Sequence, residues 1–116
     1  MSRSDDLRLL DILDASERLG RIVARGRDAF RDDEAVQPAV ERLLEVIEES
    51  ANAMTAEGRA PVVGTAWDDV RRLRILLAHH YHRVDADQVW SITTVDVPAL
   101  AGAIRAARPD LEERAP

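Results

Sequence analysis

The sequence predicts an all-α protein, an up-and-down bundle of four to five helices joined by short loops. Apolar residues recur at spacings of three and four along most of the chain, which is the period of an amphipathic helix. Strand signals are nearly absent, because the longest β-branched stretch, Ser91 to Val97, lies inside such a helical pattern. The 116 residues, 46% of them hydrophobic and 33% charged, fit a single globular domain covering residues 1–116.

The first helix is predicted from about Asp5 to Arg25, with Ser4 as its N-cap and Gly26 at its end. A short turn around Phe30 follows. The apolar stripe of this helix consists of Leu9, Ile12, Leu13, Leu19, Ile22 and Val23.

The second helix is predicted from about Glu34 to Thr55, with Pro38 near its start, where a missing N–H is tolerated best. Residues 57–64 contain two glycines and a proline and are expected to form the main loop. The inward residues of the helix are expected to be Val40, Leu43, Leu44, Ile47, Ala51 and Met54.

The third helix is predicted to begin at Thr65, which with Asp68 resembles a capping box, and to end near His80. A loop over residues 81–84 leads to Asp85, the N-cap of the next helix.

The fourth helix is predicted over residues 86–95, and a further helix is expected to restart at Asp96-Val97-Pro98 and to end at Ala107. The tail, residues 108–116, is expected to be frayed.

The overall charge restricts how the protein meets a nucleic acid. The net charge is −6, so the chain repels phosphate at long range, and RNA chemistry requires a local positive patch. All 16 basic residues are arginine, which excludes lysine as a nucleophile or base. The absence of cysteine excludes disulfides and thiol chemistry, and no apolar segment has the length of a membrane span or a signal peptide. A cytoplasmic location without membrane contact is expected.

One basic segment, residues 70–84, carries the chemically informative side chains. It contains no carboxylate although the chain has 22, and it holds all three histidines and the only tyrosine. Imidazole can transfer a proton near pH 7, and an arginine fork stabilises charge that develops on phosphorus. These two groups suffice for RNA cleavage without a metal. Four arginines complete the segment: Arg71, Arg72, Arg74 and Arg83.

Spacing within this segment suggests a site shared between two copies. Arg74 and Tyr81 are seven residues apart and share a helical face. Arg74 and His79 are five apart, which is about 140° around an ideal helix, so they converge poorly. Either the helix end bends at His79 or the partner groups come from a second subunit.

A metal or cofactor is not expected. His79 and His82, with Asp85 nearby, have a spacing that could hold zinc, but two or three ligands without a fourth make a poor site. Purely structural roles also remain open: Arg74 as a surface arginine, His79 as a helix C-terminal histidine and Tyr81 as a packing residue. Trp67 and Trp90 are expected to pack in the core or in a dimer interface.

Residues 74–81, RILLAHHY, form an R-x4-H-x-Y motif. This motif resembles the signature of HEPN ribonucleases, specifically the HepT toxins of two-gene toxin–antitoxin modules. The resemblance covers about residues 5–105, in order and spacing. It includes LDILDA from Leu10, AVERLLEVI from Ala39, Trp67 before the motif, and the segment from Val89-Trp90 to Leu100 after it.

The resemblance implies a two-fold homodimer of HEPN-type bundles whose motif segments meet at a cleft between subunits. It implies RNA cleavage, with tRNA among the candidate substrates, by Arg74 and His79 as catalytic residues. It also implies a partner, an MntA-type nucleotidyltransferase antitoxin that transfers AMP to Tyr81. Arg71, His80 and His82 are predicted to bind the substrate.

Ile75 departs from the family pattern, which usually has Asn or Asp directly after the motif arginine. This substitution removes a hydrogen-bonding partner from the site. It supports an alternative function, a non-catalytic HEPN dimer that binds a nucleotidyltransferase or a nucleotide.

Overall fold

The computed structural model describes residues 3–64, 66–78 and 86–114. The described residues form seven α-helices and one π-helical turn: α1 (Arg3–Val23), α2 (Arg27–Asp32), α3 (Val36–Ala53), α4 (Ala56–Arg59), α5 (Ala66–Ala78), α6 (Ala86–Ser91), η1 (Ile92–Asp96) and α7 (Val97–Ala107). Four segments are long, namely α1, α3, α5 and the continuous run from α6 through η1 to α7. The predicted all-α bundle is therefore confirmed, with two short helices added between the long ones.

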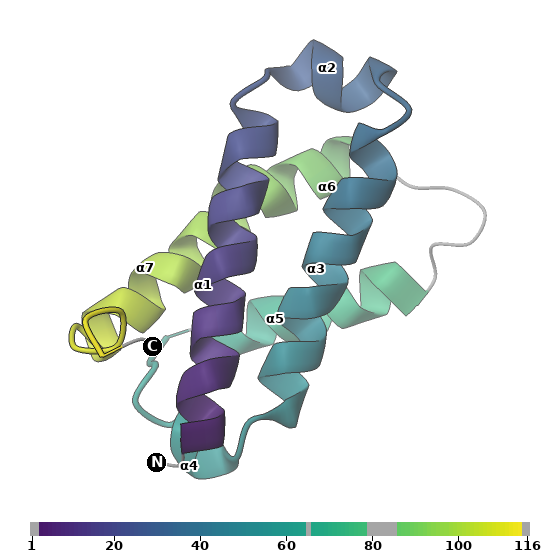
Figure 1. Ribbon diagram of the computed structural model, residues 1–116. Coiled ribbons are helices and arrows are strands. Elements are labelled where there is room, and N and C mark those ends of the chain that lie inside the picture. The colour runs from purple at the N-terminus through teal and green to yellow at the C-terminus, as the bar shows by residue number, and fades with distance from the viewer. Residues whose placement is uncertain (1–2, 65, 79–85, 115–116) are drawn as a thin grey trace.

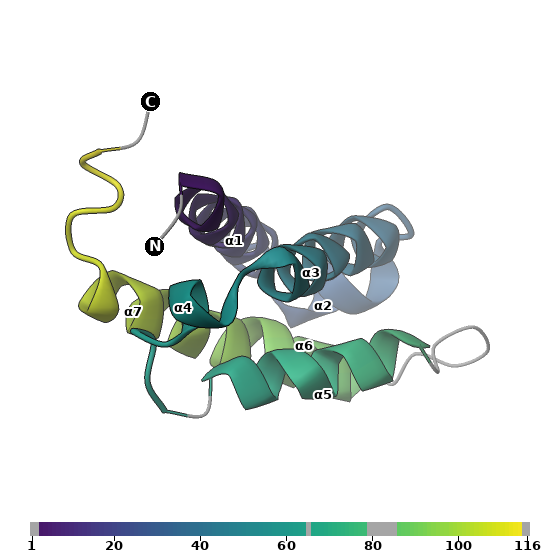
Figure 2. The same ribbon diagram turned by 90° about the horizontal axis from the view of Figure 1, so that it is seen from below.

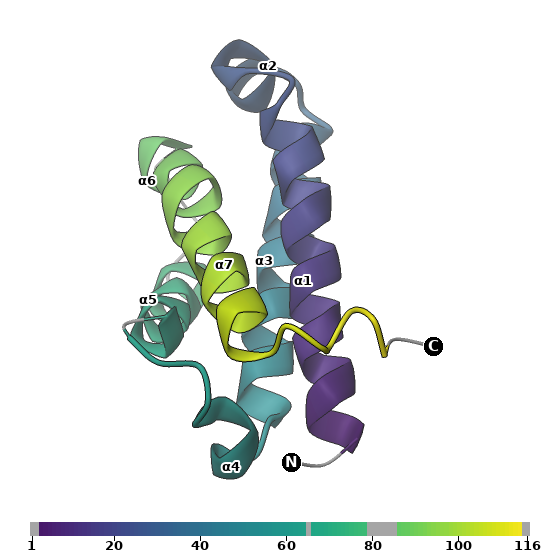
Figure 3. The ribbon, with the colours of Figure 1, turned by 90° about the vertical axis from the view of Figure 1, so that its left-hand side faces the viewer.

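The helices form two layers. Helices α1 and α3 run antiparallel, with α2 connecting them at one end (Figure 1). Helix α5 and the α6–α7 run lie together on one side of that pair (Figure 2). Helix α5 crosses the direction of α1 and α3 steeply, and α7 runs diagonally across them (Figure 3). The first layer is thus up-and-down, whereas the second crosses it.

The core lies between the two layers. Leu9, Ile12 and Leu19 of α1 have no exposed surface, and neither do Val40, Leu44 and Ile47 of α3 or Ile104 of α7. At the α2 end, the Phe30 and Trp90 rings meet edge to face, with centroids 5.1 Å apart. The predicted apolar stripes thus face inward, with Ile22, Val23 and Leu43 only partly buried. Trp90 packs on this core, as the sequence predicts.

A π-helical turn replaces the predicted restart at Asp96. Pro98 has no N–H to donate to the Thr94 carbonyl and its ring crowds that carbonyl, so a regular α-turn is disfavoured there. Instead, the Val97 N–H donates to the carbonyl of Ile92, five residues back, and the helix continues without a break. Helix α7 begins at Val97 as predicted, but Asp96 has helical dihedral angles and its side chain makes no capping hydrogen bond, so the chain is not interrupted there.

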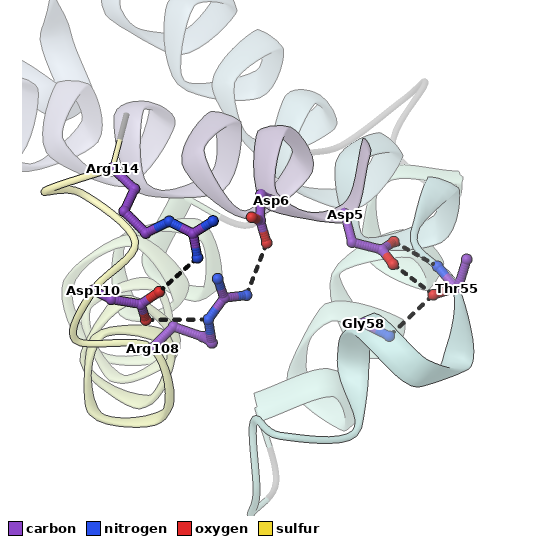
Figure 4. A network of polar contacts seen from close by, with 7 residues as sticks. All are labelled: Asp5, Asp6, Thr55, Gly58, Arg108, Asp110 and Arg114. Atoms are coloured by element: carbon purple, nitrogen blue, oxygen red, sulfur yellow. Dashed lines mark hydrogen bonds and ion pairs between the residues drawn. The ribbon is translucent and has the colours of Figure 1, made fainter. Parts of the chain in front are cut away.

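A corner between α3 and α5 replaces the start of the predicted loop over residues 57–64. Thr55 caps the short helix α4 by accepting a 3.0 Å hydrogen bond from the Gly58 N–H. The carboxylate of Asp5, only 2% exposed, accepts hydrogen bonds from the Thr55 N–H at 2.9 Å and from its hydroxyl at 2.6 Å (Figure 4). The first turn of α1 is therefore fixed to the corner that leads into α5.

The C-terminal tail is docked where the sequence predicts fraying. Helix α7 ends at Ala107 as predicted, but Leu111 is only 2% exposed. Arg108 pairs with Asp6 of α1 at 2.8 Å and with Asp110 at 3.4 Å (Figure 4). Residues 108–114 are thus packed against the bundle, because an apolar side chain and an ion-pair network hold them there.

Other predicted boundaries are met only in part. Ser4 lies inside α1 rather than at its cap, while Gly26 takes a φ of 97° just past the helix end, as the predicted stop requires. Thr65, Asp85 and the loop over residues 81–84 lie outside the described residues. Among the described residues, no helix combines the length and apolar character needed to cross a bilayer.

Candidate functional site

Helix α5 presents the motif arginine to solvent. Ala66, Val70 and Leu73 are 7%, 6% and 3% exposed and fix one face of the helix on the core. Asp68 and Asp69 in the first turn suit the positive end of the helix dipole. The opposite face therefore carries Arg71 and Arg74, three residues apart and both exposed.

The predicted histidines and the tyrosine lie outside the described residues. These are His79, His80, Tyr81 and His82. The roles predicted for these residues, and the cleft between two copies, stay predictions.

A carboxylate from α3 holds the guanidinium of Arg74. Arg74 Nε lies 3.5 Å from Glu48 Oε1, and the Glu48 side chain is 16% exposed whereas that of Arg74 is 68% exposed. The same Glu48 oxygen accepts a hydrogen bond from the side-chain amide of Asn52, one turn along α3. Glu48 therefore orients Arg74 at its Nε edge and leaves the rest of the guanidinium accessible. Glu48 lies outside the basic segment and far from Arg74 in the sequence, so no local pattern indicated this pair.

A pocket of about 280 Å³ opens beside Arg74, between the end of α3, helix α4 and helix α5. Two of the arginines in its wall, Arg71 and Arg74, come from the basic segment, and a third, Arg59, comes from α4. The polar and aromatic side chains that line it are Asn52, Arg59, Trp67, Asp68, Arg71 and Arg74. The structure thus brings three guanidinium groups to one depression on an acidic protein.

The other side of α5 is acidic rather than basic. Arg72 is ion-paired with Asp69, whose side chain is 14% exposed. Burial, and then repulsion from Asp69, raise the pKa of Asp96 above its ordinary value. This face therefore carries two carboxylates, Asp69 and Asp96, against one guanidinium, that of Arg72.

Ile75 is exposed on α5 directly after the motif arginine. Its exposed fraction is 55%, and Val95 of η1 is 61% exposed. The position where the resemblance expects a polar side chain thus places an apolar one in contact with solvent.

Comparison with known proteins identifies the family. The family model described as "Ribonuclease HepT-like" matches residues 12–107. The chain belongs to the HepT-like ribonuclease family. Membership confirms the family that the motif predicts and the enzyme class that goes with it, a ribonuclease.

Two curated HepT-like relatives illustrate the match. A Thermococcus cleftensis protein named as a HepT ribonuclease is 30% identical over 103 residues, which are 88% of this chain and 94% of that protein. A Methanocaldococcus jannaschii protein named as an RNase is 34% identical over 71 residues, 61% of this chain and 59% of that protein. The chain therefore spans nearly all of the first relative and about three fifths of the second. No solved structure matches the chain significantly.

Proposed function

We propose that this HepT-like protein is a metal-independent endoribonuclease and the toxin of a toxin–antitoxin module. The observation that carries the proposal is the exposed guanidinium of Arg74, which Glu48 orients and which lies five residues before His79. Its RNA cleavage would occur at a cleft between two copies, and AMP transfer to Tyr81 would silence it.

The reaction needs one proton carrier and one anion stabiliser. His79 would take the proton of a ribose 2′-hydroxyl as that oxygen attacks phosphorus. The new P–O2′ bond forms as the P–O5′ bond breaks, giving a 2′,3′-cyclic phosphate and a 5′-hydroxyl that gains a proton. Arg74 would hold the non-bridging oxygens while their negative charge grows. His80, His82 and Arg71 would bind the flanking RNA.

The test of catalysis uses purified protein, total tRNA and EDTA. Wild-type protein is expected to cleave RNA, and Arg74→Ala and His79→Ala are expected to lower kcat by about 10²-fold or more. Arg21→Ala, which removes an exposed arginine of α1, serves as the control and should keep full activity. Wild-type protein that leaves RNA intact would favour the alternative function, a binding dimer, for which the exposed Ile75 is the supporting observation.

A mixing experiment tests whether the site is shared. If Arg74 and His79 of one site come from different subunits, a heterodimer of Arg74→Ala and His79→Ala contains one site with both residues. An equimolar mixture after subunit exchange should then regain about a quarter of wild-type activity, because half of the dimers are mixed and one of their two sites is intact. A mixture as inactive as either variant would show that both residues act within one chain.

Silencing by AMP is tested by mass spectrometry. Co-expression with the nucleotidyltransferase partner should add about 329 Da per AMP, and Tyr81→Phe should abolish the gain. The added phosphodiester would place bulk and negative charge beside the motif arginine. Modified protein that still cleaves RNA at the wild-type rate would contradict this part of the proposal.

A further inference from the structure

The pocket beside Arg74 contains a group that the motif does not supply. Arg59 lies on α4, 15 positions before Arg74, and lines the pocket together with residues of α3 and α5. Neither the motif nor the basic segment includes it. It adds a third arginine to the pocket lining, from a different helix than Arg71 and Arg74.

Two contacts fix Arg59 in place. Its Nη1 donates a 3.2 Å hydrogen bond to the carbonyl of Ala51, near the end of α3. Its own carbonyl accepts a 3.0 Å hydrogen bond from the indole Nε1 of Trp67. Neither contact neutralises the positive charge, because both partners are uncharged. The guanidinium is therefore held in position while its charge remains available to an anion.

Arg71 is the second arginine of the pocket that has no ion pair with a carboxylate of the described residues. It is exposed and, within residues 3–64, 66–78 and 86–114, forms no ion pair. The carboxylate in the pocket lining is that of Asp68, which is also exposed. Three guanidinium groups against two carboxylates, Asp68 in the lining and Glu48 beside Arg74, leave a net positive local charge, in a protein whose net charge is −6.

We propose that this pocket binds one nucleotide of the RNA strand next to the cleaved bond, with its phosphate between Arg59 and Arg71 and its base beside Trp67. This inference rests on the proposed ribonuclease function, because it assumes that Arg74 contacts the cleaved phosphate. The volume of about 280 Å³ is at the lower end for ligand pockets and suits a single nucleotide. Asn52 and Asp68 offer hydrogen-bonding groups for base or ribose edges.

The binding test uses a short single-stranded RNA with 2′-O-methyl groups, which lacks the attacking hydroxyl and is not cleaved. Arg59→Gln removes the charge but retains a side-chain N–H for the Ala51 carbonyl. We expect it to weaken the Kd about tenfold, which is the scale of one charge-assisted hydrogen bond. The binding constant should also depend less on salt: the slope of its logarithm against the logarithm of the salt concentration should become about 0.7 less negative, the value for one phosphate contact with a single strand. Arg71→Gln should have a similar effect.

Arg114→Gln is the matched control. It removes one exposed guanidinium, paired with Asp110 at 3.2 Å, from the docked tail rather than from the pocket. The Kd and salt slope should stay at wild-type values. Thermal unfolding of each variant separates loss of binding from loss of folding.

The fluorescence of Trp67 reports whether RNA occupies the pocket. The chain has two tryptophans, so Trp90→Phe leaves Trp67 as the only indole while keeping an aromatic ring against Phe30. Saturating 2′-O-methyl RNA should change the fluorescence of this variant, and Arg59→Gln in the same background should shift the titration to about tenfold higher RNA.

The outcomes separate the pocket from the catalytic proposal. If wild-type protein cleaves RNA but Arg59→Gln and Arg71→Gln bind RNA with the wild-type Kd, only the proposal of a nucleotide-binding pocket is contradicted. Binding that depends on Arg59 in a protein that cleaves no RNA would support the pocket and contradict the nuclease. A Trp67 signal that responds equally to a polyglutamate peptide would also overturn the proposal, since the pocket would then select negative charge without nucleotide chemistry.

Discussion

At the scale of single residues, the position of Arg74 depends on a side chain of another helix. Glu48 reaches Arg74 Nε at 3.5 Å and is itself bonded by Asn52. A guanidinium on a solvent-facing helix otherwise samples several rotamers, and freezing them costs free energy. Glu48 thus restricts the arginine to fewer rotamers, and in the proposed mechanism this would prepare it for a phosphate.

Replacing Glu48 should separate kcat from KM. Glu48→Gln retains an oxygen acceptor for Asn52 but loses the charge that attracts Arg74. We expect kcat for RNA cleavage to fall about tenfold with KM within about twofold, the pattern of an interaction that matters mainly in the transition state. Glu49→Gln, next in sequence and 3.6 Å from Arg42, is the control and should cleave at the wild-type rate. An equal loss of kcat in Glu48→Gln and Glu49→Gln would contradict the role of Glu48 in positioning Arg74.

Asp96 gives a prediction on pH. Burial and then Asp69 raise its pKa in the folded protein. The folded state therefore binds the Asp96 proton more tightly than the unfolded state does. The stabilisation of the fold by protonated Asp96 is complete below the ordinary carboxyl pKa of about 3.9, and it is lost as the pH rises through the raised pKa of the folded state. Asp96→Asn should raise the Tm by about 1–3 °C at pH 7 and by nothing near pH 3.

The control for this pH effect is Asp11→Asn, which changes an exposed carboxylate of α1. It should leave the Tm unchanged at both pH values, measured by circular dichroism. A gain for Asp96→Asn that persists near pH 3 would mean that charge is not its cause.

At the scale of elements, the α3–α4 corner depends on a close approach between Asp5 and Gly58. A Cβ on Gly58 would lie 2.6 Å from Asp5 Oδ2 and 2.8 Å from its Cβ, so one of the two segments would have to move. Because the same carboxylate binds Thr55, any such movement would break the connection that fixes α1 to α4. Glycine is needed here for space rather than for an unusual dihedral angle.

Alanine at two glycines should have opposite effects. Gly58→Ala is expected to lower the free energy of unfolding by about 1–3 kcal/mol through overpacking. Gly102→Ala in α7, where a Cβ meets nothing within 4 Å, should raise it by about 0.5–1 kcal/mol, since alanine favours a helix interior. Urea unfolding of both variants measures these values. A stabilised Gly58→Ala protein would show that the corner adjusts freely.

At the scale of the whole molecule, the tail and the α5 pocket lie apart. The tail packs beside α1 and α7, whereas the pocket lies between α3, α4 and α5 (Figure 2). Besides the Arg108 pairs, Arg105 bridges Glu17 of α1 and Glu112 of the tail at 3.0 and 2.8 Å. The exposed pairs of Arg105 contribute little each, so the buried Leu111, with the partly buried Arg108–Asp6 pair, is expected to supply most of the docking free energy.

Leu111→Ala should therefore destabilise the fold without changing catalysis. We expect a loss of about 1.5–3 kcal/mol, the value of a buried leucine side chain, and a Tm lower by about 6–12 °C. Glu113→Ala, two residues later and exposed, should change the Tm by less than about 2 °C. The rate of RNA cleavage at 25 °C should match wild type in both, and a specific loss in Leu111→Ala would mean that the tail reaches the site.

The sequence by itself determined the all-α class, the four long helical segments and the family, because the apolar period of a helix and the R-x4-H-x-Y spacing are local properties of the chain. It left open whether Arg74 is a surface arginine, and the structure places that side chain on the exposed face of α5. Only the tertiary structure decided that Glu48 orients Arg74, that Arg59 joins the pocket, and that Asp5 closes the α4 corner. These pairs join residues far apart in sequence, and their contacts depend on how the two layers cross, which no local pattern encodes.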